Sequence, residues 1–459
     1  MAGRAVVRSA APRSQGAPRE PSGRRARWVA GIVLCLLAGR APAWATNLII
    51  ATVDNAQMAQ MQQLTPVFEK AHPDIRVRWV TLPEGALRKD VAADIMTQGE
   101  QFDIVTIGLY ETALWARKGW LKPLRLGAGY DAADLLAPIR EGLSFRGMLY
   151  AAPFYGESSI LMYRKDLLLH AGLHMPAQPT WSQIGRFAAR LNDPGRHIHG
   201  ICLRARPGWG ENMALVTTMV NSFGGQWFDE HWQPQLLGKP WRRAVGLYVR
   251  LLRSYGPSDA IQRNYNGNLA LFEQGHCAMW VGASIAAGFV SDPRLSKVAG
   301  RVGFAPAPVE VTAKGSHWLW AWALAIPSDL GAGQTAAART FIAWATSRAY
   351  VQLVAQRFGW GLVPPGTRRS TYAHASFQAA APWAGVELQA IESADPGDPT
   401  LPRSPYTGIQ FVEIPQFPTI GDEVGREIGL AVRGRIGVEQ ALQAAQAATR
   451  RTMVLAGYP

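Results

Sequence analysis

The stretch Pro153-Phe154-Tyr155-Gly156-Glu157-Ser158-Ser159 lies between two segments typical of β-strands, residues 147–152 and 160–164. Pro153 and Gly156 punctuate the backbone there, so the chain leaves one β region and enters another. Aromatic faces can cover the C–H groups of a polyhydroxy ligand while a carboxylate accepts from its hydroxyls. We therefore interpret the stretch as a crossing between two lobes and as one wall of a ligand cleft. An ordinary turn within a single α/β domain is the alternative.

Strands and helices alternate ahead of this crossing. The patterns predict strands at 47–53, 75–80 and 102–107 and helices at 58–72 and 87–96. Such alternation predicts a parallel sheet, and ligands bind beyond the carboxyl ends of its strands. Asn55 and Glu111, with Asp54 and Tyr110, stand at those ends. Each of them is equally explained as a helix cap or a turn residue.

The chain after the crossing also mixes helices and strands and contains no internal repeats. The patterns predict helices at 181–191, 213–223, 241–255, 266–274, 335–354, 383–393 and within 419–455, and strands at 200–203, 275–282 and 317–326. Residues 395–418 are rich in Pro, Asp and Gly, which predicts a loop.

Tryptophans recur at the ends of these segments. Trp209 is flanked by glycines, a setting that favours an exposed stacking surface over a core position. Glu211 and Asn212 follow it and either stabilise the first turn of a helix or hydrogen-bond a ligand. Trp280 ends the strand at 275–282.

Three further indoles, Trp318, Trp320 and Trp322, share one face of the last strand because they occupy every second position. Core packing is the alternative. Each buried indole N–H needs a partner, so we expect at least one of the three to line a cleft.

The positive charge is concentrated at the N-terminus. The 459-residue chain, long enough for two or three domains, has a formal charge of +14. Residues 1–45 hold eight arginines and one acid, and the remainder has 39 basic and 32 acidic residues, a net of +7. These basic residues are scattered, which argues against a nucleic-acid interface.

The N-terminal segment is typical of a secretory signal. Arg24, Arg25 and Arg27 precede an apolar run at 28–38, and Ala43-Trp44-Ala45 fits a cleavage site after Ala45. An uncleaved anchor is the alternative, although the run is short for a membrane span. The start codon and the export route, twin-arginine or general, stay open. Cys202 and Cys277 would remain after cleavage, either as a disulfide or as two buried thiols.

The chain carries no phosphate loop, dinucleotide fingerprint or nucleophile elbow. His197 and His199 have no neighbouring cysteine or carboxylate cluster with metal spacing, so we expect no metal site. Glu111, Glu157 and Glu211 could supply the acid pair of a glycosidase, but nothing in the sequence places two of them at the required separation. Many tryptophans and few titratable groups favour binding over catalysis.

Several of these segments resemble the extracellular solute-binding proteins of ABC sugar importers (family 1). The resemblance rests on the strand at 47–53, Phe102-Asp103-Ile104-Val105, the crossing with Met162-Tyr163-Arg164-Lys165-Asp166 after it, and Ala278-Met279-Trp280. Within the family the chain is most similar to mannitol/sorbitol (polyol) binders, through Phe154–Ser159, Gly208-Trp209-Gly210-Glu211-Asn212, Asn268-Leu269-Ala270-Leu271-Phe272 and Trp318-Leu319-Trp320-Ala321-Trp322.

The resemblance implies a two-lobed α/β periplasmic-binding-protein fold (type II), with a mostly parallel sheet in each lobe and hinge crossings between them. The lobes would be 46–155 with 318–362, and 156–317 with 363–459. It implies a periplasmic monomer without cofactor or catalytic activity that delivers a polyol to a membrane permease driven by a cytoplasmic ATPase. The ligand-binding residues would be Asn55, Glu111, Tyr155, Glu157, Trp209, Glu211, Asn212, Trp280, Trp318 and Trp320.

One position departs from the subgroup, because Gly282 stands where polyol binders often carry an acid. The identity of the polyol therefore stays open. A glycerol-3-phosphate-type binder is the main alternative, since Arg204, Arg206 and Arg403 could pair with a phosphate. An exported glycosidase or a structural protein are the others.

Overall fold

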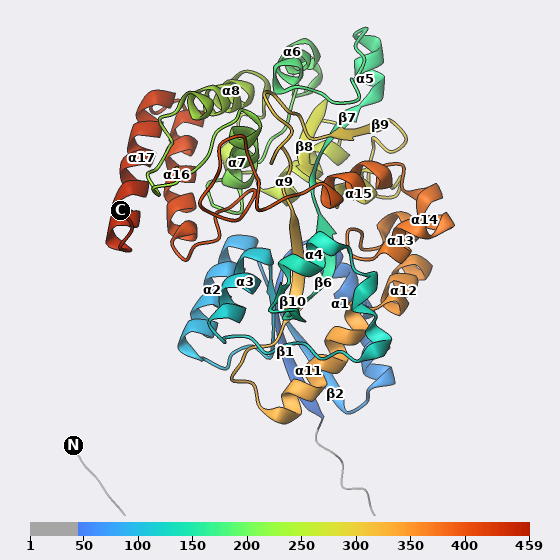
Figure 1. The fold of residues 1–459 in the computed structure, drawn as a ribbon. Coiled ribbons are helices and arrows are strands. Elements are labelled where there is room, and N and C mark those ends of the chain that lie inside the picture. The colour runs from blue at the N-terminus through green and yellow to red at the C-terminus, as the bar shows by residue number, and fades with distance from the viewer. Residues whose placement is uncertain (1–44) are drawn as a thin grey trace, which may run out of the picture. The chain divides into compact units, whose positions relative to one another are not determined.

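The computed structural model describes residues 45–459, and the predicted signal peptide lies outside this range except for Ala45. The described residues form two α/β lobes, each with its own sheet, as predicted (Figure 1). The first sheet contains β1 (Thr46–Val53), β2 (Ile75–Leu82), β3 (Ile104–Ile107), β6 (Ala151–Glu157) and β10 (Trp320–Ala325). The second contains β7 (Ser159–Arg164), β8 (Met279–Ala283) and β9 (Val302–Pro306), and a separate hairpin pairs β4 (Ser144–Phe145) with β5 (Met148–Leu149).

The first sheet has the strand order β2-β1-β3-β10-β6. β1 runs parallel to β2 and β3, while β10 runs antiparallel to both β3 and β6. It is therefore mostly parallel, as predicted, with β10 as the antiparallel member. Its strands end at one edge, where Asp54 follows β1 and Pro83 follows β2.

The prediction of a mostly parallel sheet is wrong for the second lobe. β7 pairs antiparallel with both β8 and β9, and the predicted strand at 200–203 contributes an isolated parallel bridge from Cys202 to Trp280. The connection that leads into β7 explains the antiparallel pairing. Ser158 alone separates β7 from β6, so β7 enters the second lobe directly from the crossing. No strand–helix–strand unit, which would make neighbouring strands parallel, sets the direction of β7.

Helices surround both sheets (Figure 1). Near the first sheet lie α1 (Ala56–Ala71), α2 (Glu84–Thr97), α3 (Leu109–Arg117), α4 (Ala137–Gly142), α11 (Ala332–Ala345) and α12 (Arg348–Phe358). The remaining helices are α5 (Lys165–His170), α6 (Trp181–Leu191), α7 (Asn212–Ser222), α8 (Lys239–Tyr255), α9 (Tyr265–Glu273), α10 (Ala286–Ser291), α13 (Arg369–Ala373), α14 (Ala375–Ala380), α15 (Ala384–Glu392), α16 (Phe417–Val432) and α17 (Val438–Leu455). Short 3-10 turns occupy Ala128–Tyr130, Ala132–Asp134, Pro194–Arg196, Ala260–Gln262 and Trp360–Leu362.

The single helix predicted at 335–354 is in fact two helices, α11 and α12. Ser347 separates them because its hydroxyl accepts a hydrogen bond from the backbone N–H of Tyr350 at 3.0 Å, which starts a new helix. The pattern of apolar residues continues across the break, so periodicity alone could not reveal it.

The crossing is a strand and not a turn, because residues 153–157 belong to β6. β6 is an edge strand, and Pro153 lies where its pairing register with β10 shifts between Trp322 and Ala323. An edge position with a bulge suits proline, which has no N–H to donate to the ladder.

A second segment, around Pro365 and Gly366, runs beside this crossing. Gly156 donates its backbone N–H to the carbonyl of Pro365 at 3.0 Å. A Cβ on Gly366, which has φ +68°, would lie 2.0 Å from the carbonyl oxygen of Gly156. The two backbones are thus in direct contact, and only glycine permits this approach.

A chain of hydrogen bonds around Glu387 connects the same segments. Ser158 donates its N–H to Ser284 Oγ at 3.2 Å, and the Ser284 hydroxyl donates to Glu387 Oε1 at 2.5 Å. The Tyr372 hydroxyl donates to Glu387 Oε2 at 2.7 Å and accepts from the N–H of Gly366 at 3.0 Å. We call Ser158, Ser284, Gly366, Tyr372 and Glu387 the Glu387 network.

A disulfide joins Cys202 to Cys277, with 5.9 Å between their Cα atoms, which answers a question that the sequence left open. It lies beside the parallel bridge from Cys202 to Trp280 and two residues before Arg204. The covalent link therefore fixes the start of the segment 204–212, which carries several residues of the cavity described below.

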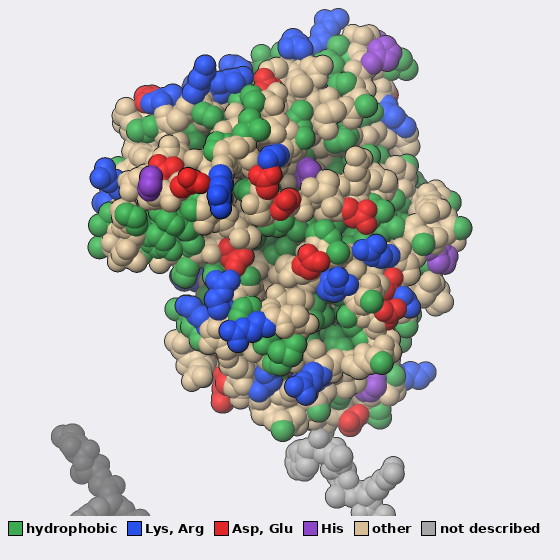
Figure 2. All heavy atoms as spheres, viewed as in Figure 1, with side chains coloured by type: hydrophobic (Ala, Val, Ile, Leu, Met, Phe, Trp, Pro, Cys, Tyr) green, Lys and Arg blue, Asp and Glu red, His purple; other side chains and the backbone are tan. Residues whose placement is uncertain are grey.

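Figure 2 shows Lys and Arg interspersed with Asp and Glu on the visible face, without a basic stripe. Among residues 45–459, no helix combines the length and the apolar character needed to cross a membrane.

Candidate ligand-binding site

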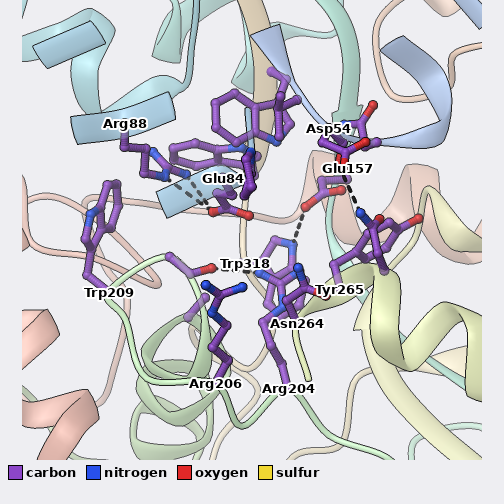
Figure 3. Close-up of a pocket in the computed structure, with 18 of the residues that line it drawn as sticks. Asp54, Glu84, Arg88, Glu157, Arg204, Arg206, Trp209, Asn264, Tyr265 and Trp318 are labelled. Carbon is purple, nitrogen blue, oxygen red and sulfur yellow. Dashed lines mark hydrogen bonds and ion pairs between the residues drawn. The ribbon is translucent and has the colours of Figure 1, made fainter. Parts of the chain in front are cut away.

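A cavity of about 180 Å³ lies where the end of the first sheet meets loops of the second lobe (Figure 3). Indoles, carboxylates, guanidinium groups and amides line it. Its lining consists of Val53, Asp54, Asn55, Pro83, Glu84, Arg88, Tyr155, Glu157, Arg204, Arg206, Trp209, Gly210, Ala214, Asn264, Tyr265, Asn266, Trp318, Trp320, Trp322 and Gln410.

The end of β1 supplies the first polar groups. The side-chain oxygen of Asn55 accepts from the N–H of Met58 at 2.9 Å and caps α1. Its amide nitrogen donates to the Tyr155 hydroxyl at 3.1 Å, which fixes the phenol at the cavity. Asn55 is thus both the helix cap and the cavity residue that the sequence offered as alternatives.

The end of β6 supplies a carboxyl group, and the segment just before β10 supplies an indole. Glu157 pairs with Trp320 across the two strands, and the Trp318 indole N–H donates to Glu157 Oε1 at 3.2 Å. Burial raises the pKa of Glu157 to about 8, although Arg204 acts to lower it. A carboxyl group can accept more than this one hydrogen bond, so Glu157 retains capacity for a ligand hydroxyl.

Helix α2 supplies Glu84 and Arg88, which share one face because they lie one turn apart. The Arg88 guanidinium lies 4.1 Å from the ring centroid of Trp209, 4.6 Å from that of Trp320 and 4.7 Å from that of Trp322. Two carboxylates hold it, Glu84 at 3.1 Å and Glu111 at 2.5 Å. Burial opposes the charge on Arg88, but Glu111 and Glu84 together raise its pKa.

The second lobe supplies the loop ahead of α7. Arg204 donates from Nη1 to the carbonyl of Gly210 at 2.7 Å, and the N–H of Trp209 donates to Asp422 Oδ1 at 2.9 Å. These bonds shape the loop from both sides. A Cβ on Gly210 would lie 2.6 Å from Glu84 Oε1, so the loop backbone is packed directly against α2.

The start of α9 completes the lining. Asn264 caps this helix, accepting from the N–H of Gly267 at 3.0 Å, and Tyr265 follows it. The side-chain amide of Asn266 donates to the backbone carbonyl of Asp54 at 3.0 Å. This bond joins a helix packed on β8 to the end of β1 in the other sheet.

The formal charges of the lining cancel. Asp54, Glu84 and Glu157 contribute three carboxylates, and Arg88, Arg204 and Arg206 contribute three guanidinium groups. Glu211 lies 3.9 Å from Arg204, and burial raises its pKa to about 7. The two arginines that are buried here, Arg88 and Arg204, therefore each have acidic side chains close by.

The structure brings together six of the ten predicted binding residues. They line the same cavity although they come from distant parts of the sequence: Asn55, Tyr155, Glu157, Trp209, Trp318 and Trp320. Trp209 is only 7 % exposed, so the expectation of an exposed stacking surface is wrong. Its ring packs against Tyr110, Trp320 and Phe417 at the junction of the two lobes.

The other four predicted residues stand behind the lining. Glu111 caps α3 through the N–H of Gly108 at 3.0 Å and pairs with Arg88. Glu211 lies beside Arg204, and Asn212 is buried and donates to the carbonyl of Gly425 at 2.9 Å. Trp280 packs in the core, 5.9 Å from the ring of Tyr265. Three of the four are in contact with residues of the lining, whereas Asn212 accepts from the N–H of Gly208 in the neighbouring loop. The residue types in the sequence could not show which residues line the cavity and which stand behind it.

Sequence reasoning missed several residues of the cavity. Glu84 follows the carboxyl end of β2, so the rule that selected Asn55 would also have found Glu84. Arg88 is one helical turn further on. Tyr265 carried no distinctive signal. Of the three arginines considered for a phosphate, Arg204 and Arg206 line the cavity, whereas Arg403 is exposed and lies 3.8 Å from Glu230.

The described residues contain no cluster of three His, Cys, Asp or Glu side chains that could hold a metal ion.

Comparison with known proteins identifies the family of the chain. A model of the bacterial extracellular solute-binding protein family matches residues 52–352. A mannitol-binding protein of Pseudomonas aeruginosa is 54 % identical over 416 residues, which cover 90 % of this chain and 95 % of the relative.

Two solved structures also match. An ABC transporter solute-binding protein of Agrobacterium vitis with bound D-mannitol has a TM-score of 0.89 and 51 % identity, covering 90 % of this chain and all of that one. A solute-binding protein of Agrobacterium radiobacter in complex with ribitol has a TM-score of 0.79 and 25 % identity over the same share of each chain. The chain belongs to the bacterial extracellular solute-binding protein family.

Proposed function

We propose that this protein is the binding component of an ABC importer and that it captures a neutral polyol, of the mannitol or sorbitol type, in the cavity between its lobes. The observation that carries the proposal is the lining of the cavity. Indole faces stand beside carboxyl groups and amides, and the buried arginines have acidic partners. The 54 % identical mannitol-binding protein supports the same ligand class.

The indoles and the carboxylates would act on different parts of the ligand. A polyol presents C–H groups along its chain, which pack on aromatic faces such as those of Trp318 and Trp320. Its hydroxyls would donate to Glu157, Glu84 and Asp54 and accept from Arg204 and the amide of Asn264. A phosphate ester would meet Asp54 and Glu84 here, and the buried Arg88 and Arg204 already have acidic partners, which favours a neutral ligand.

The lobes are proposed to be residues 46–155 with 318–362, and 156–317 with 363–459. Binding residues then come from both, and a ligand that contacts both at once favours the closed arrangement. Membership of an extracellular family supports a periplasmic location after cleavage behind Ala45, docking on a membrane permease with its ATPase, and no catalytic activity.

Calorimetric titration of the purified protein would test the ligand class. The panel is D-mannitol, D-glucitol, D-arabitol, ribitol, maltose and glycerol 3-phosphate. We expect at least one polyol to bind with a dissociation constant in the micromolar range or below, and glycerol 3-phosphate to bind more weakly. Binding of glycerol 3-phosphate alone would overturn the proposal in favour of the phosphate-ester binder.

A pair of tryptophan variants would place the site. Trp318→Ala removes an indole of the cavity, and we expect it to weaken polyol binding by about tenfold or more. Trp360→Ala is the matched control, because Trp360 stacks on His374 at 3.9 Å outside the cavity. Equal affinity in the two variants would show that the polyol binds elsewhere.

A further inference from the structure

A second and larger cavity, of about 690 Å³, adjoins the ligand cavity. Both are lined by Glu84, Arg88, Arg206, Trp209 and Gly210, so these residues form a partition with one cavity on each side. On the far side the second cavity is lined by residues of α2, α3 and α16, among them Met96, Trp115 and Asp422. We call the five shared residues the partition.

The partition is built from both lobes. Glu84 and Arg88 lie on α2, which packs on β1 and β2, whereas Arg206, Trp209 and Gly210 precede α7 in the other lobe. Its centre is the contact between the Arg88 guanidinium and the Trp209 ring, at 4.1 Å. Figure 3 shows these two side chains at one end of the cavity, opposite Asp54 and Tyr265.

Several bonds hold the partition in place. Arg88 is fixed by Glu84 and Glu111, and Trp209 by the bond from its N–H to Asp422 at 2.9 Å. Tyr110 supports the outer side of the Trp209 ring at 4.9 Å, and the Tyr110 hydroxyl donates to the carbonyl of Ile414 at 2.8 Å. Because ion pairs and packed rings hold the side chains of the partition, a longer ligand could displace them only by disrupting these contacts.

We infer that the partition, and Trp209 above all, sets the maximum length of the ligand by separating a short-polyol cavity from space that a second sugar unit would fill. This inference rests on the proposed function. A hexitol would fit on one side of the wall, whereas its terminal glucoside would have to pass through it. Discrimination then comes from a steric barrier and not from missing contacts, since the second cavity offers polar and aromatic side chains.

The test compares each hexitol with its terminal glucoside. Dissociation constants of D-mannitol, D-glucitol and their glucosides are measured by calorimetry for the wild type and for Trp209→Ala. We expect the wild type to prefer the hexitol by more than about tenfold, and Trp209→Ala to reduce that preference by about tenfold or more, because the two cavities merge. Circular dichroism checks the fold, and Trp209→Leu replaces the alanine variant if the latter does not fold.

Gly85 provides the matched control. It lines the second cavity alone, and a Cβ there would meet nothing within 4 Å. Gly85→Phe would place a ring in the second cavity, so in the Trp209→Ala background it should abolish the gain in glucoside binding. By itself it should leave hexitol affinity within about threefold of the wild type.

The outcomes separate the two proposals. A wild type that binds neither hexitols nor their glucosides contradicts the proposed function. A wild type that binds hexitols but accepts the glucosides equally well overturns the role of the partition. A folded Trp209 variant that keeps the wild-type preference, or that binds no glucoside, overturns it as well.

Discussion

Two buried carboxyl groups, Glu157 at the cavity and Glu387 at the crossing, have similar surroundings and different partners. Burial raises the pKa of Glu157 to about 8 and that of Glu387 to about 7. Glu387 receives one hydroxyl on each oxygen, from Ser284 and Tyr372. Glu157 receives one indole N–H, from Trp318, and lines the cavity. A buried carboxyl group whose two oxygens both have hydrogen-bond partners contributes to the stability of the fold. A carboxyl group that lines a cavity and can accept further hydrogen bonds is available to a ligand.

Mutations at the crossing should therefore lower the stability of the protein, and mutations at the cavity should lower its affinity for the ligand. The largest effect is expected for Gly366→Ala, since the new Cβ would meet the Gly156 carbonyl at 2.0 Å in a left-handed conformation. Strain of about 1–2 kcal/mol and overpacking of about 1–3 kcal/mol should together lower the free energy of unfolding by about 4 kcal/mol. Urea denaturation measures it.

Gly172→Ala is the control for that experiment. Gly172 has the same φ of +68°, but a Cβ there would meet nothing within 4 Å. It should cost only the conformational strain, about 1 kcal/mol. Equal losses of unfolding free energy in the two variants would show that the contact between the two crossing segments contributes nothing to stability.

The next effect concerns pH. The pKa of Glu387 rises from an ordinary value of 4.5 to about 7, so between these values the native protein holds a proton that the unfolded chain has lost. The free energy of unfolding should therefore fall as pH rises through this window, on the order of 3 kcal/mol from this group. Glu387→Gln should remove that part of the decline.

Unfolding curves of wild type and Glu387→Gln at pH 5 and pH 7.5 give the comparison. Other buried acids contribute to both proteins, so the difference between the two slopes isolates Glu387. Parallel slopes would mean that Glu387 titrates normally. Ligand affinity should stay within about threefold in this variant, because Glu387 does not line the cavity.

The smallest of the three effects in free energy is the one expected at the cavity. Glu157→Ala removes an acceptor for ligand hydroxyls and should weaken polyol binding by about 10–100-fold, or about 1.5–3 kcal/mol. Calorimetry measures it, with Glu387→Gln as the second buried acid. If both variants bind polyol equally well, the distinction between the two acids fails.

The sequence predicted β1, β2, β3, β10, α1 and α2 of the first lobe and much of the cavity for identifiable reasons. Asn55 was found because ligands bind at strand ends, Glu157 because it lies on the crossing, and Trp318 because of its alternation with two other indoles. These signals are local in the chain. The break at Ser347 and the continuous strand through Pro153 were missed because a cap and a bulge override periodicity.

The remaining cavity residues could not be predicted from local patterns. Arg88 belongs to the lining because α2 meets the loop at Gly210, and that meeting depends on how the lobes pack. Trp280 has the same type and strand position as the indoles of the cavity but lies behind Tyr265. Which of two equivalent aromatic residues faces the ligand is decided by tertiary contacts far apart in the sequence.

The place of β10 has a consequence for the order in which the chain can fold. Among the strands of the first sheet, β6 is the next after β3 in the sequence, yet β10 lies between them in the sheet. β6 pairs only with β10 in that sheet, so it has no partner there until residue 325 of 459 is available. Completion of this sheet must wait for closure of a loop of more than 160 residues between β6 and β10, and such distant pairings form slowly.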